Sequence, residues 1–334
     1  MRIAVMGTGS WGTAYAMVLA DAGNEVVMWG RDAELCEAIT STHENPRYHP
    51  GIALPSSLRA TADPGEALGG VTVAVLAVPA QTLRGNLASW TDVLPKGAVL
   101  VSLMKGVEQG TTKRMSEVAA EVAGVDAMQV AVVSGPNLAR EIAERQPAAT
   151  TIACPNPATA ELLAEASTTA YFRPYWTTDV VGTEIGGSVK NVVALANGMA
   201  VGMGYGENAQ SALITRGLAE MTRLGVALGA SPLTFLGLAG IGDLVATCQS
   251  PLSRNRTFGE HLGRGLTLDQ ATAEMKQTCE GVKSCRAILE LAQGQGVDMP
   301  ITEQVVEVVH AGLDPREMLQ AFMSRSLKAE AEVG

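Results

Sequence analysis

Lys190 is a charged residue in a segment rich in small and apolar residues, Val181–Asn191. Lysine is seldom buried unless it has a partner or a task. Reducing a ketone or oxidising an alcohol requires a group that binds and releases a proton near neutral pH, and a partly buried amine can do this. Lys190 is therefore a candidate general acid or base. A lysine whose ammonium group extends along the helix to solvent would produce the same pattern.

Two further polar segments could act on an anionic substrate. Asp243 follows the turn Gly240-Ile241-Gly242 and precedes a helical pattern, so its carboxylate could cap that helix, orient a lysine, or do both. The segment Ser253-Arg254-Asn255-Arg256 places two guanidinium groups before another helical pattern. Backbone N–H groups and arginine together suit a phosphate or a carboxylate. A solvated basic loop is the alternative for this second segment.

The first twelve residues contain a candidate nucleotide-binding turn. An apolar run, Ile3–Met6, leads into Gly7-x-Gly9-x-x-Gly12, and apolar residues at helical spacing follow. In such a strand–turn–helix the first glycine permits the tight turn and the second lets the backbone approach the pyrophosphate, while the third allows close helix packing. N–H groups at the start of the helix then face the anion. The pattern predicts a dinucleotide site, and an ordinary glycine-rich turn is the alternative.

The residues after the second predicted strand bear on which dinucleotide binds. That strand, residues 25–29, is followed by Gly30, Arg31 and Asp32. An acidic residue near this point favours NAD, whereas an arginine accommodates the 2′-phosphate of NADP. Arg31 therefore favours NADPH without excluding NADH. An exposed turn arginine with no ligand is the alternative.

The order of predicted elements indicates the fold. Strand-like apolar runs alternate with helical patterns from residue 2 to about 175, which predicts an α/β domain with a Rossmann-like, doubly wound, mainly parallel sheet. From about residue 180 only helical patterns are expected. We therefore expect a dinucleotide-binding domain at 1–180 and an all-helical substrate-binding and catalytic domain at 181–334. The strands are expected near 2–6, 25–29, 71–78, 98–102, 128–133, 148–153 and 170–175, with a proline-rich loop at 45–51.

Five residues share a position relative to the predicted strands. Gly7, Gly30, Pro79, Lys105 and Gly135 each come just past a strand end. Ligands of open α/β sheets collect at the carboxyl ends of the strands. These residues should therefore line one crevice.

Composition narrows the classes of function and location. A net charge of −10 on 334 residues argues against nonspecific binding to nucleic acid or to anionic membranes. Five cysteines without a Cys-x-x-Cys pair and four histidines without metal-ligand spacing favour a cytoplasmic protein with reduced thiols and no metal site. No signal peptide is expected, because glycine interrupts the N-terminal apolar run, and the apolar segment 191–205 is too short to span a membrane.

Seven short segments, taken together, resemble the NAD(P)-dependent glycerol-3-phosphate dehydrogenase family of bacterial type. They occur in the family's order between residue 7 and about residue 285, and as a set they are highly specific. The resemblance implies reversible hydride transfer between NADP or NAD and dihydroxyacetone phosphate, giving sn-glycerol 3-phosphate, a precursor of glycerophospholipids. The segments are Gly7–Ala14, Lys105-Gly106, Gly135–Ala139, Gly186–Asn191, Gly240–Leu244, Ser253–Asn255 and Cys279–Gly281.

The resemblance also implies roles for individual residues. Lys190 would be the general acid or base, and Lys105 and Asp243 would hold the substrate and position Lys190 as further catalytic residues. The substrate would be bound by Lys105, Gly135, Asn137, Lys190, Asp243, Ser253, Arg254 and Asn255. The cofactor would be bound by Gly7, Gly9, Ser10, Trp11, Gly12, Arg31, Tyr48, Lys105, Ala139, Arg254, Thr278 and Glu280. Two positions depart from the family pattern: Asn137 replaces a common serine but keeps hydrogen bonding, and Thr278 stands where an aliphatic residue is expected.

Two other functions have to be separated from this one. A β-hydroxyacid dehydrogenase would share the glycine-rich start, the helical second domain and a catalytic lysine, but would not need residues 253–256 for a substrate phosphate. A nucleotide sensor without turnover would not need a proton-transfer lysine. The expected partners are a small phosphorylated substrate and, in a homodimer, a second copy of the chain. Neither nucleic acid nor an integral membrane segment is expected.

Overall fold

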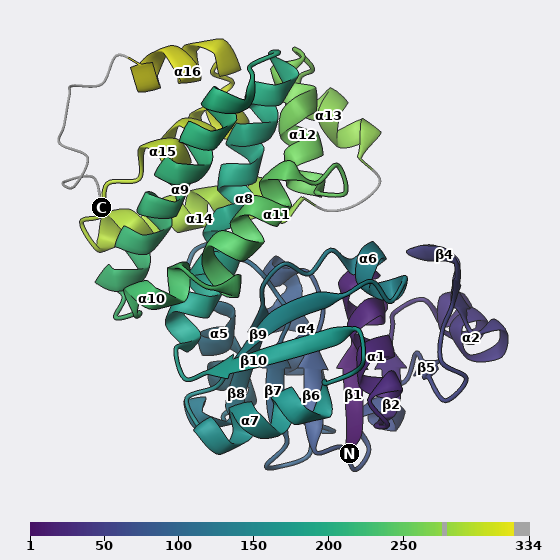
Figure 1. The fold of residues 1–334 in the computed structure, drawn as a ribbon. Coiled ribbons are helices and arrows are strands. Elements are labelled where there is room, and N and C mark those ends of the chain that lie inside the picture. The colour runs from purple at the N-terminus through teal and green to yellow at the C-terminus, as the bar shows by residue number, and fades with distance from the viewer. Residues whose placement is uncertain (276–278, 324–334) are drawn as a thin grey trace. The chain divides into compact units, whose positions relative to one another are not determined.

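The computed structural model describes residues 1–275 and 279–323, and the chain divides into two compact units. The first unit comprises residues 1–104 and 114–180, and the second comprises residues 105–113 and the chain from 181 onward. Figure 1 shows a sheet with its helices in the first unit and a group of helices in the second. The predicted fold class, a Rossmann-like domain followed by a helical domain, is confirmed.

The sheet of the first unit has eight strands in the order β10-β9-β8-β7-β6-β1-β2-β5. Neighbouring strands pair in parallel, except that β8 and β9 are antiparallel. Because β8, β7, β6, β1 and β2 run in one direction, Gly7, Gly30, Pro79 and Gly135 follow strand ends at the same edge of the sheet. The strands are β1 (Arg2–Met6), β2 (Glu25–Trp29), β5 (Arg59–Thr61), β6 (Val73–Leu76), β7 (Val99–Ser102), β8 (Val130–Ser134), β9 (Ala148–Ala153) and β10 (Phe172–Thr177).

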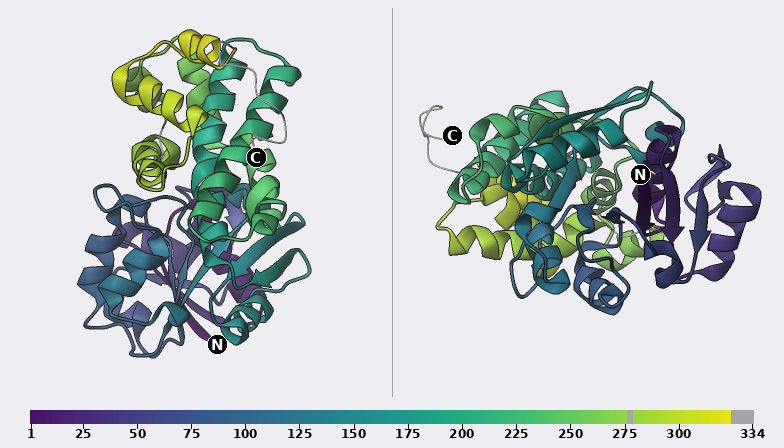
Figure 2. Two further views of the ribbon diagram at one scale, coloured as in Figure 1. Left: turned by 90° about the vertical axis from the view of Figure 1, so that its left-hand side faces the viewer. Right: turned by 90° about the horizontal axis from the view of Figure 1, so that it is seen from below.

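Helices bury both faces of the central part of this sheet, which is why the strands β1, β2, β6, β7 and β8 are nearly continuous apolar runs. Side chains of β1 alternate between two cores, with Ile3 and Val5 in one and Ala4 and Met6 in the other. Residues of α1 belong to the first core and residues of α4 and α5 to the second, and Figure 2 shows helices on both sides of the sheet. The helices are α1 (Ser10–Asp21), α2 (Ala33–Thr42), α3 (Pro64–Leu68), α4 (Leu83–Trp90), α5 (Met115–Ala123), α6 (Ala139–Ala143) and α7 (Pro157–Ala166), with 3₁₀ turns η1 (Ala80–Thr82) and η2 (Ala127–Gln129).

Residues 45–51, expected to be a loop, contribute to an antiparallel hairpin of β3 (Glu44–Asn45) and β4 (His49–Ala53). The expectation was wrong because proline and glycine usually interrupt strands. Here Pro50 and Gly51 are exposed, and Gly51 has a φ of 75°, so neither residue breaks a buried ladder. Asn45 and His49 are buried.

The second unit is built around the long helix α8 (Val180–Gly202), which is buried from residue 182 to residue 200. This burial explains the apolar sequence of the helix without a membrane. The apolar side chains of the unit form one core. The other elements are α9 (Glu207–Ala227), α10 (Pro232–Phe235), η3 (Leu238–Gly242), α11 (Asp243–Gln249), α12 (Arg254–Gly263), α13 (Leu268–Glu274), α14 (Glu280–Gly294), α15 (Pro300–Val306), η4 (Glu307–Ala311) and α16 (Pro315–Met323).

Glycines bring α8 and α12 into backbone contact. A Cβ atom at Gly198 or Gly202 of α8 would collide with the carbonyl oxygen of Arg256 or Glu260 in α12. In the other direction, a Cβ at Gly259 or Gly263 of α12 would collide with a carbonyl oxygen of α8. Two glycines four residues apart on each helix therefore let the backbones touch, as small residues do at close helix crossings.

Within the described residues, Pro232–Gln249 is long and apolar enough to span a membrane by length and composition, with a mean hydropathy of 1.2. The backbone of this stretch is not helical at Gly240, where φ is −102° and ψ is −107°. The stretch therefore forms the separate elements α10, η3 and α11 rather than one straight helix. It also carries a buried, ion-paired Asp243, which a membrane-spanning helix seldom tolerates.

Gly198→Ala is expected to lower the free energy of unfolding by about 1–3 kcal/mol, because the added methyl group would push α8 and α12 apart. The measurement is urea unfolding followed by circular dichroism. Gly85→Ala in α4 is the matched control, since a Cβ there meets nothing within 4 Å. That control should be neutral or up to about 1 kcal/mol stabilising. Equal effects of the two substitutions would contradict the packing argument.

Candidate active site

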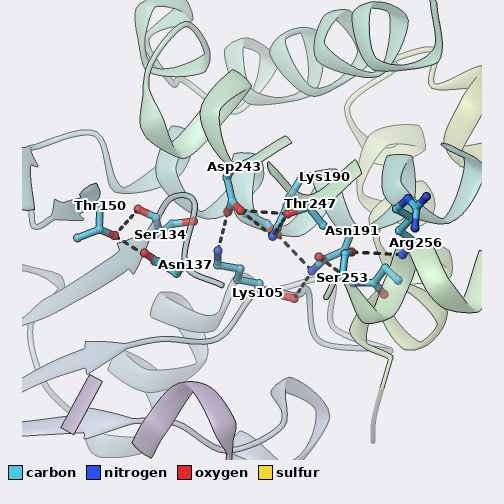
Figure 3. A network of polar contacts seen from close by, with 12 residues as sticks. Lys105, Ser134, Asn137, Thr150, Lys190, Asn191, Asp243, Thr247, Ser253 and Arg256 are labelled. Atoms are coloured by element: carbon cyan, nitrogen blue, oxygen red, sulfur yellow. Dashed lines mark hydrogen bonds and ion pairs between the residues drawn. The ribbon is translucent and has the colours of Figure 1, made fainter. Parts of the chain in front are cut away.

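Asp243 lies between the ammonium groups of two lysines in the second unit (Figure 3). Its Oδ2 is 2.5 Å from Lys105 Nζ, and its Oδ1 is 2.7 Å from Lys190 Nζ. Lys190 Nζ also donates to Thr247 Oγ1 at 2.6 Å. The side chains of Lys190 and Asp243 are 8% and 1% exposed, so these charges are held by one another rather than by water.

The local fold explains how these side chains meet. Asp243 is the first residue of α11 and lies three residues after the irregular backbone at Gly240. A Cβ at Gly186 of α8 would collide with the carbonyl oxygen of Ala239, so the missing side chain lets the turn approach the helix that carries Lys190. The cap position of α11 is Gly242, and the Asp243 carboxylate accepts hydrogen bonds from the lysines and from Thr247 at 3.2 Å. The Asp243 carboxylate therefore orients the two lysines and does not cap α11.

Burial and the neighbouring charges shift the proton affinities in this cluster. Burial lowers the pKa of Lys105 to about 8; the positive charge of Lys190 acts in the same direction, and Asp243 opposes both. Burial alone would raise the pKa of Asp243, but the two lysines hold it below its usual value. At neutral pH the cluster therefore contains a carboxylate and an ammonium group at Lys105 whose proton can be released near physiological pH.

An asparagine pair connects the lysine cluster to the predicted phosphate-binding segment. Asn255 Nδ2 donates to Asn191 Oδ1 at 2.9 Å, and Asn255 Oδ1 accepts from the backbone N–H of Gly281 at 3.0 Å. Asn191 Nδ2 in turn lies 3.5 Å from the carbonyl oxygen of Lys105. These contacts fix the start of α12 relative to α8 and α14.

The start of α12 has the composition of an anion site. Ser253 is its N-cap and accepts from the backbone N–H of Arg256 at 3.3 Å. Arg254 is exposed. Arg256 lies 3.4 Å from Glu260 one helical turn later. An exposed guanidinium beside a helix N-cap has the chemistry to bind a phosphate.

In the first unit, Gly135 and Asn137 follow the end of β8. Gly135 has a φ of 140°, which favours glycine. Asn137 Nδ2 donates to Thr150 Oγ1 at 3.0 Å, and that hydroxyl donates to the carbonyl oxygen of Ser134 at 3.0 Å. Asn137 Oδ1 is buried without a hydrogen-bond partner, and Figure 3 shows the three polar side chains together. Ala139 begins α6 directly after this turn.

The glycine-rich turn has the geometry of a pyrophosphate site. Gly7 has a φ of 147°, and a Cβ there would collide with the carbonyl oxygen of Ala77. A Cβ on Gly12 would lie 2.5 Å from the carbonyl oxygen of Gly7, whereas one on Gly9 would meet nothing within 4 Å. Gly9 is the N-cap of α1 and makes no side-chain cap. The backbone at Gly9 and the start of α1 are therefore open to an anion, so this turn fits a dinucleotide.

The other residues predicted to bind the cofactor lie in different elements of the two units. Arg31 is exposed, and Asp32 beside it caps α2 at Leu35 N, 3.1 Å away, and pairs with Arg47 at 2.5 Å. Asp32 is thus engaged by protein groups. Tyr48 packs on the first core, Trp11 Nε1 is buried without a partner, and Glu280 begins α14. Thr278 lies outside the described residues.

Sequence reasoning missed two members of the cluster. Thr247 is four residues after Asp243, so both lie on one face of α11, and Asn191 is the neighbour of Lys190. The helical spacing could have identified Thr247. Sequence reasoning also did not indicate that residues 105–113 belong to the second unit. The described part of the chain contains no group of three or more His, Cys, Asp or Glu residues that could hold a metal ion.

Comparisons with known proteins give the family. Residues 2–160 match the model of the NAD-dependent glycerol-3-phosphate dehydrogenase N-terminus, and residues 179–320 match that of the C-terminus. A glycerol-3-phosphate dehydrogenase [NAD(P)+] of Streptomyces griseus is 63% identical over 330 residues, covering 99% of this chain and 98% of the relative. The chain belongs to the NAD-dependent glycerol-3-phosphate dehydrogenase family.

Solved structures of this family have the same fold. A glycerol-3-phosphate dehydrogenase of Coxiella burnetii is 38% identical with a TM-score of 0.91, covering 97% of this chain and 98% of that chain. The Saccharomyces cerevisiae enzyme is 27% identical with a TM-score of 0.83, covering 96% and 98%. Membership of this family favours the predicted dehydrogenase over the β-hydroxyacid dehydrogenase and sensor alternatives.

Lys105→Met is expected to change how stability depends on pH. Lys105 has a folded-state pKa of about 8, whereas an unfolded lysine has a pKa of ~10.4. Between these values the unfolded chain binds more protons, so the contribution of Lys105 makes stability rise with pH, by on the order of 3 kcal/mol in total. Lys105→Met should remove that rise in urea unfolding measured from about pH 8 to pH 10.

The exposed Lys96 provides the control for this measurement. Lys96→Met should keep the pH dependence of the unmodified protein. The same pH dependence in Lys105→Met and Lys96→Met would contradict the lowered pKa of Lys105.

Proposed function

We propose that this protein catalyses reversible hydride transfer between NAD(P)H and dihydroxyacetone phosphate, giving sn-glycerol 3-phosphate for glycerophospholipid synthesis. The observation that carries the proposal is the buried Asp243 carboxylate shared by Lys105 and Lys190, at 2.5 and 2.7 Å. Two fixed ammonium groups beside an anion-binding helix start suit a small ketone that bears a phosphate. The family of the chain supports the same reaction.

Lys190 is the general acid for ketone reduction and the general base for alcohol oxidation. An ammonium group has three N–H donors, and Asp243 Oδ1 and Thr247 Oγ1 accept two of those of Lys190. The third can point at the substrate oxygen. A proton held at Nζ is thereby transferred to the oxygen as negative charge develops on it, and Asp243 keeps the amine in place.

Lys105, Asp243 and the start of α12 bind the substrate. The Lys105 ammonium and the Arg254 guanidinium supply positive charge to a phosphate on a chain with a net charge of −10. Ser253 and Asn255 hold the start of α12 in the conformation that presents its backbone N–H groups. Gly135 and Asn137 are also proposed as substrate contacts, and Asn137 Oδ1 is available as an acceptor for a substrate hydroxyl.

The glycine-rich turn and its neighbours bind the cofactor. The nicotinamide supplies the hydride acceptor or donor, so no metal is needed. Gly7, Gly9 and Gly12 let the backbone approach the pyrophosphate, and Arg31 holds the 2′-phosphate of NADPH, which we propose as the preferred cofactor. Further contacts are proposed for Ser10, Trp11, Tyr48, Lys105, Ala139, Arg254, Thr278 and Glu280.

Domain roles, location and assembly belong to the same proposal. Residues 1–180, apart from the segment 105–113, are proposed as the dinucleotide-binding domain, and residues 181–334 together with that segment as the substrate-binding and catalytic domain. All five cysteines are free and buried, which supports a reducing cytoplasm. A homodimer remains a prediction, and light scattering of the purified protein would test it.

The proposed reaction is tested by following absorbance at about 340 nm, where NADPH and NADH absorb. The purified protein should oxidise NADPH with dihydroxyacetone phosphate and form sn-glycerol 3-phosphate. Dihydroxyacetone without the phosphate should react far more slowly, and β-hydroxyacids with NADP should give no signal. Turnover of β-hydroxyacids without turnover of dihydroxyacetone phosphate would refute the proposal.

Lys190→Ala is expected to lower kcat at least about a hundredfold, because it removes the general acid. NADPH binding, followed by fluorescence titration, should persist, since the glycine-rich turn is unchanged. Lys96→Ala, at an exposed position, is the control and should retain full turnover. A kcat of Lys190→Ala within threefold of the unmodified protein would remove Lys190 from the mechanism.

A further inference from the structure

Two buried side chains of the β3–β4 hairpin hold the glycine-rich turn of the first unit. Asn45 Nδ2 donates to the carbonyl oxygen of Thr8 at 3.0 Å and to Thr13 Oγ1 at 2.9 Å. His49 Nε2 lies 2.8 Å from the carbonyl oxygen of Ser10 and 3.3 Å from Ser10 Oγ. Asn45 and His49 are both 0% exposed. The hairpin therefore fixes the carbonyl groups on either side of Gly9.

Fixing these two carbonyl groups also fixes two N–H groups. A trans peptide is planar, so its C=O and N–H bonds point in opposite directions. When the carbonyl groups of Thr8 and Ser10 point at the hairpin, the N–H groups of Gly9 and Trp11 must point away from it. These N–H groups belong to the cradle proposed for the pyrophosphate, so the hairpin sets the direction of anion-binding donors.

The imidazole of His49 does this as a neutral donor. Hydrogen bonding to a carbonyl oxygen requires the proton on Nε2, and Nδ1 is buried without a partner. Burial lowers the pKa of His49; the Ser10 carbonyl opposes this, Arg140 of α6 adds to it, and Glu144 opposes it. Arg140 and Glu144 themselves form an ion pair at 2.6 Å. A neutral side chain whose N–H group can reach the Ser10 carbonyl oxygen should therefore perform the same function as the imidazole.

We propose that His49 is a positioning residue for the dinucleotide, acting through the Ser10 carbonyl to hold the phosphate-binding turn ready before the cofactor arrives. The inference rests on the proposed use of NAD(P)H but assigns a role to a residue that does not itself bind the cofactor. Preorganised donors bind more tightly than donors that must be ordered during binding. Loss of the His49 donor should thus weaken cofactor binding and leave the chemistry at the lysine cluster unchanged.

The test compares His49→Met with His49→Gln, two side chains of similar length that differ in the N–H donor. Fluorescence titration should give a Kd for NADPH about tenfold higher in His49→Met and within about threefold of the unmodified protein in His49→Gln. At saturating NADPH, kcat and the KM for dihydroxyacetone phosphate should be unchanged in both. His310→Met, which replaces a histidine of the second unit, is the control and should leave the Kd unchanged.

Each other outcome overturns the inference. Equal NADPH affinity in His49→Met and the unmodified protein would show that the donor is not used, and equal weakening in His49→Met and His49→Gln would show that the imidazole does not act as a donor. Failure of His49→Met to fold, with normal folding of His49→Gln, would make the role structural. A wild-type protein that binds NADPH but does not reduce dihydroxyacetone phosphate would refute the proposed function, while the comparison of Kd values would still decide the role of His49.

Discussion

The structure of the candidate site depends on one buried carboxylate that two lysines share. Moving a carboxylate or an ammonium group out of water costs several kcal/mol, and the cost is offset only by close pairing and hydrogen bonds. Asp243 makes ion pairs with Lys105 and Lys190 and receives a hydrogen bond from Thr247, so its charge has partners on several sides. Because these charges cannot remain buried apart, the segments that carry them have to be held in one arrangement.

Backbone contacts at glycines provide that arrangement. Gly186 lets the turn before Asp243 reach α8, and the glycines of α8 and α12 let these helices touch along their backbones. The asparagine pair Asn191–Asn255 then links α8 to the start of α12 by a hydrogen bond of 2.9 Å. The same device recurs in the first unit, where Gly7 and Gly12 close the nucleotide turn and hydrogen bonds from a hairpin fix its peptides. In both units, glycines allow backbone segments to approach closely, and hydrogen bonds from buried polar side chains then fix the orientation of those segments.

Features that depend on the local sequence pattern could be predicted from the sequence. The glycine turn, the alternating elements and the helical second unit follow from spacing and composition, and the apolar surroundings of Lys190 indicated a buried lysine with a task. Contacts between distant segments could not be read in this way. Residues 105–113 join the second unit through tertiary packing. Thr247 and Asn191 belong to the site because α8 and α11 pack together, which the sequence pattern does not show. The hairpin at 44–53 was missed because proline and glycine concealed a short strand whose buried partners, Asn45 and His49, act on the turn around Gly9.

The most direct test of the shared carboxylate is the kcat/KM of Asp243→Asn for reduction of dihydroxyacetone phosphate. Asparagine keeps the shape of the side chain but removes the charge that holds both ammonium groups. The account predicts a loss of at least about a hundredfold in kcat/KM. A kcat/KM within threefold of the unmodified protein would show that the two lysines do not depend on Asp243 and would contradict the account.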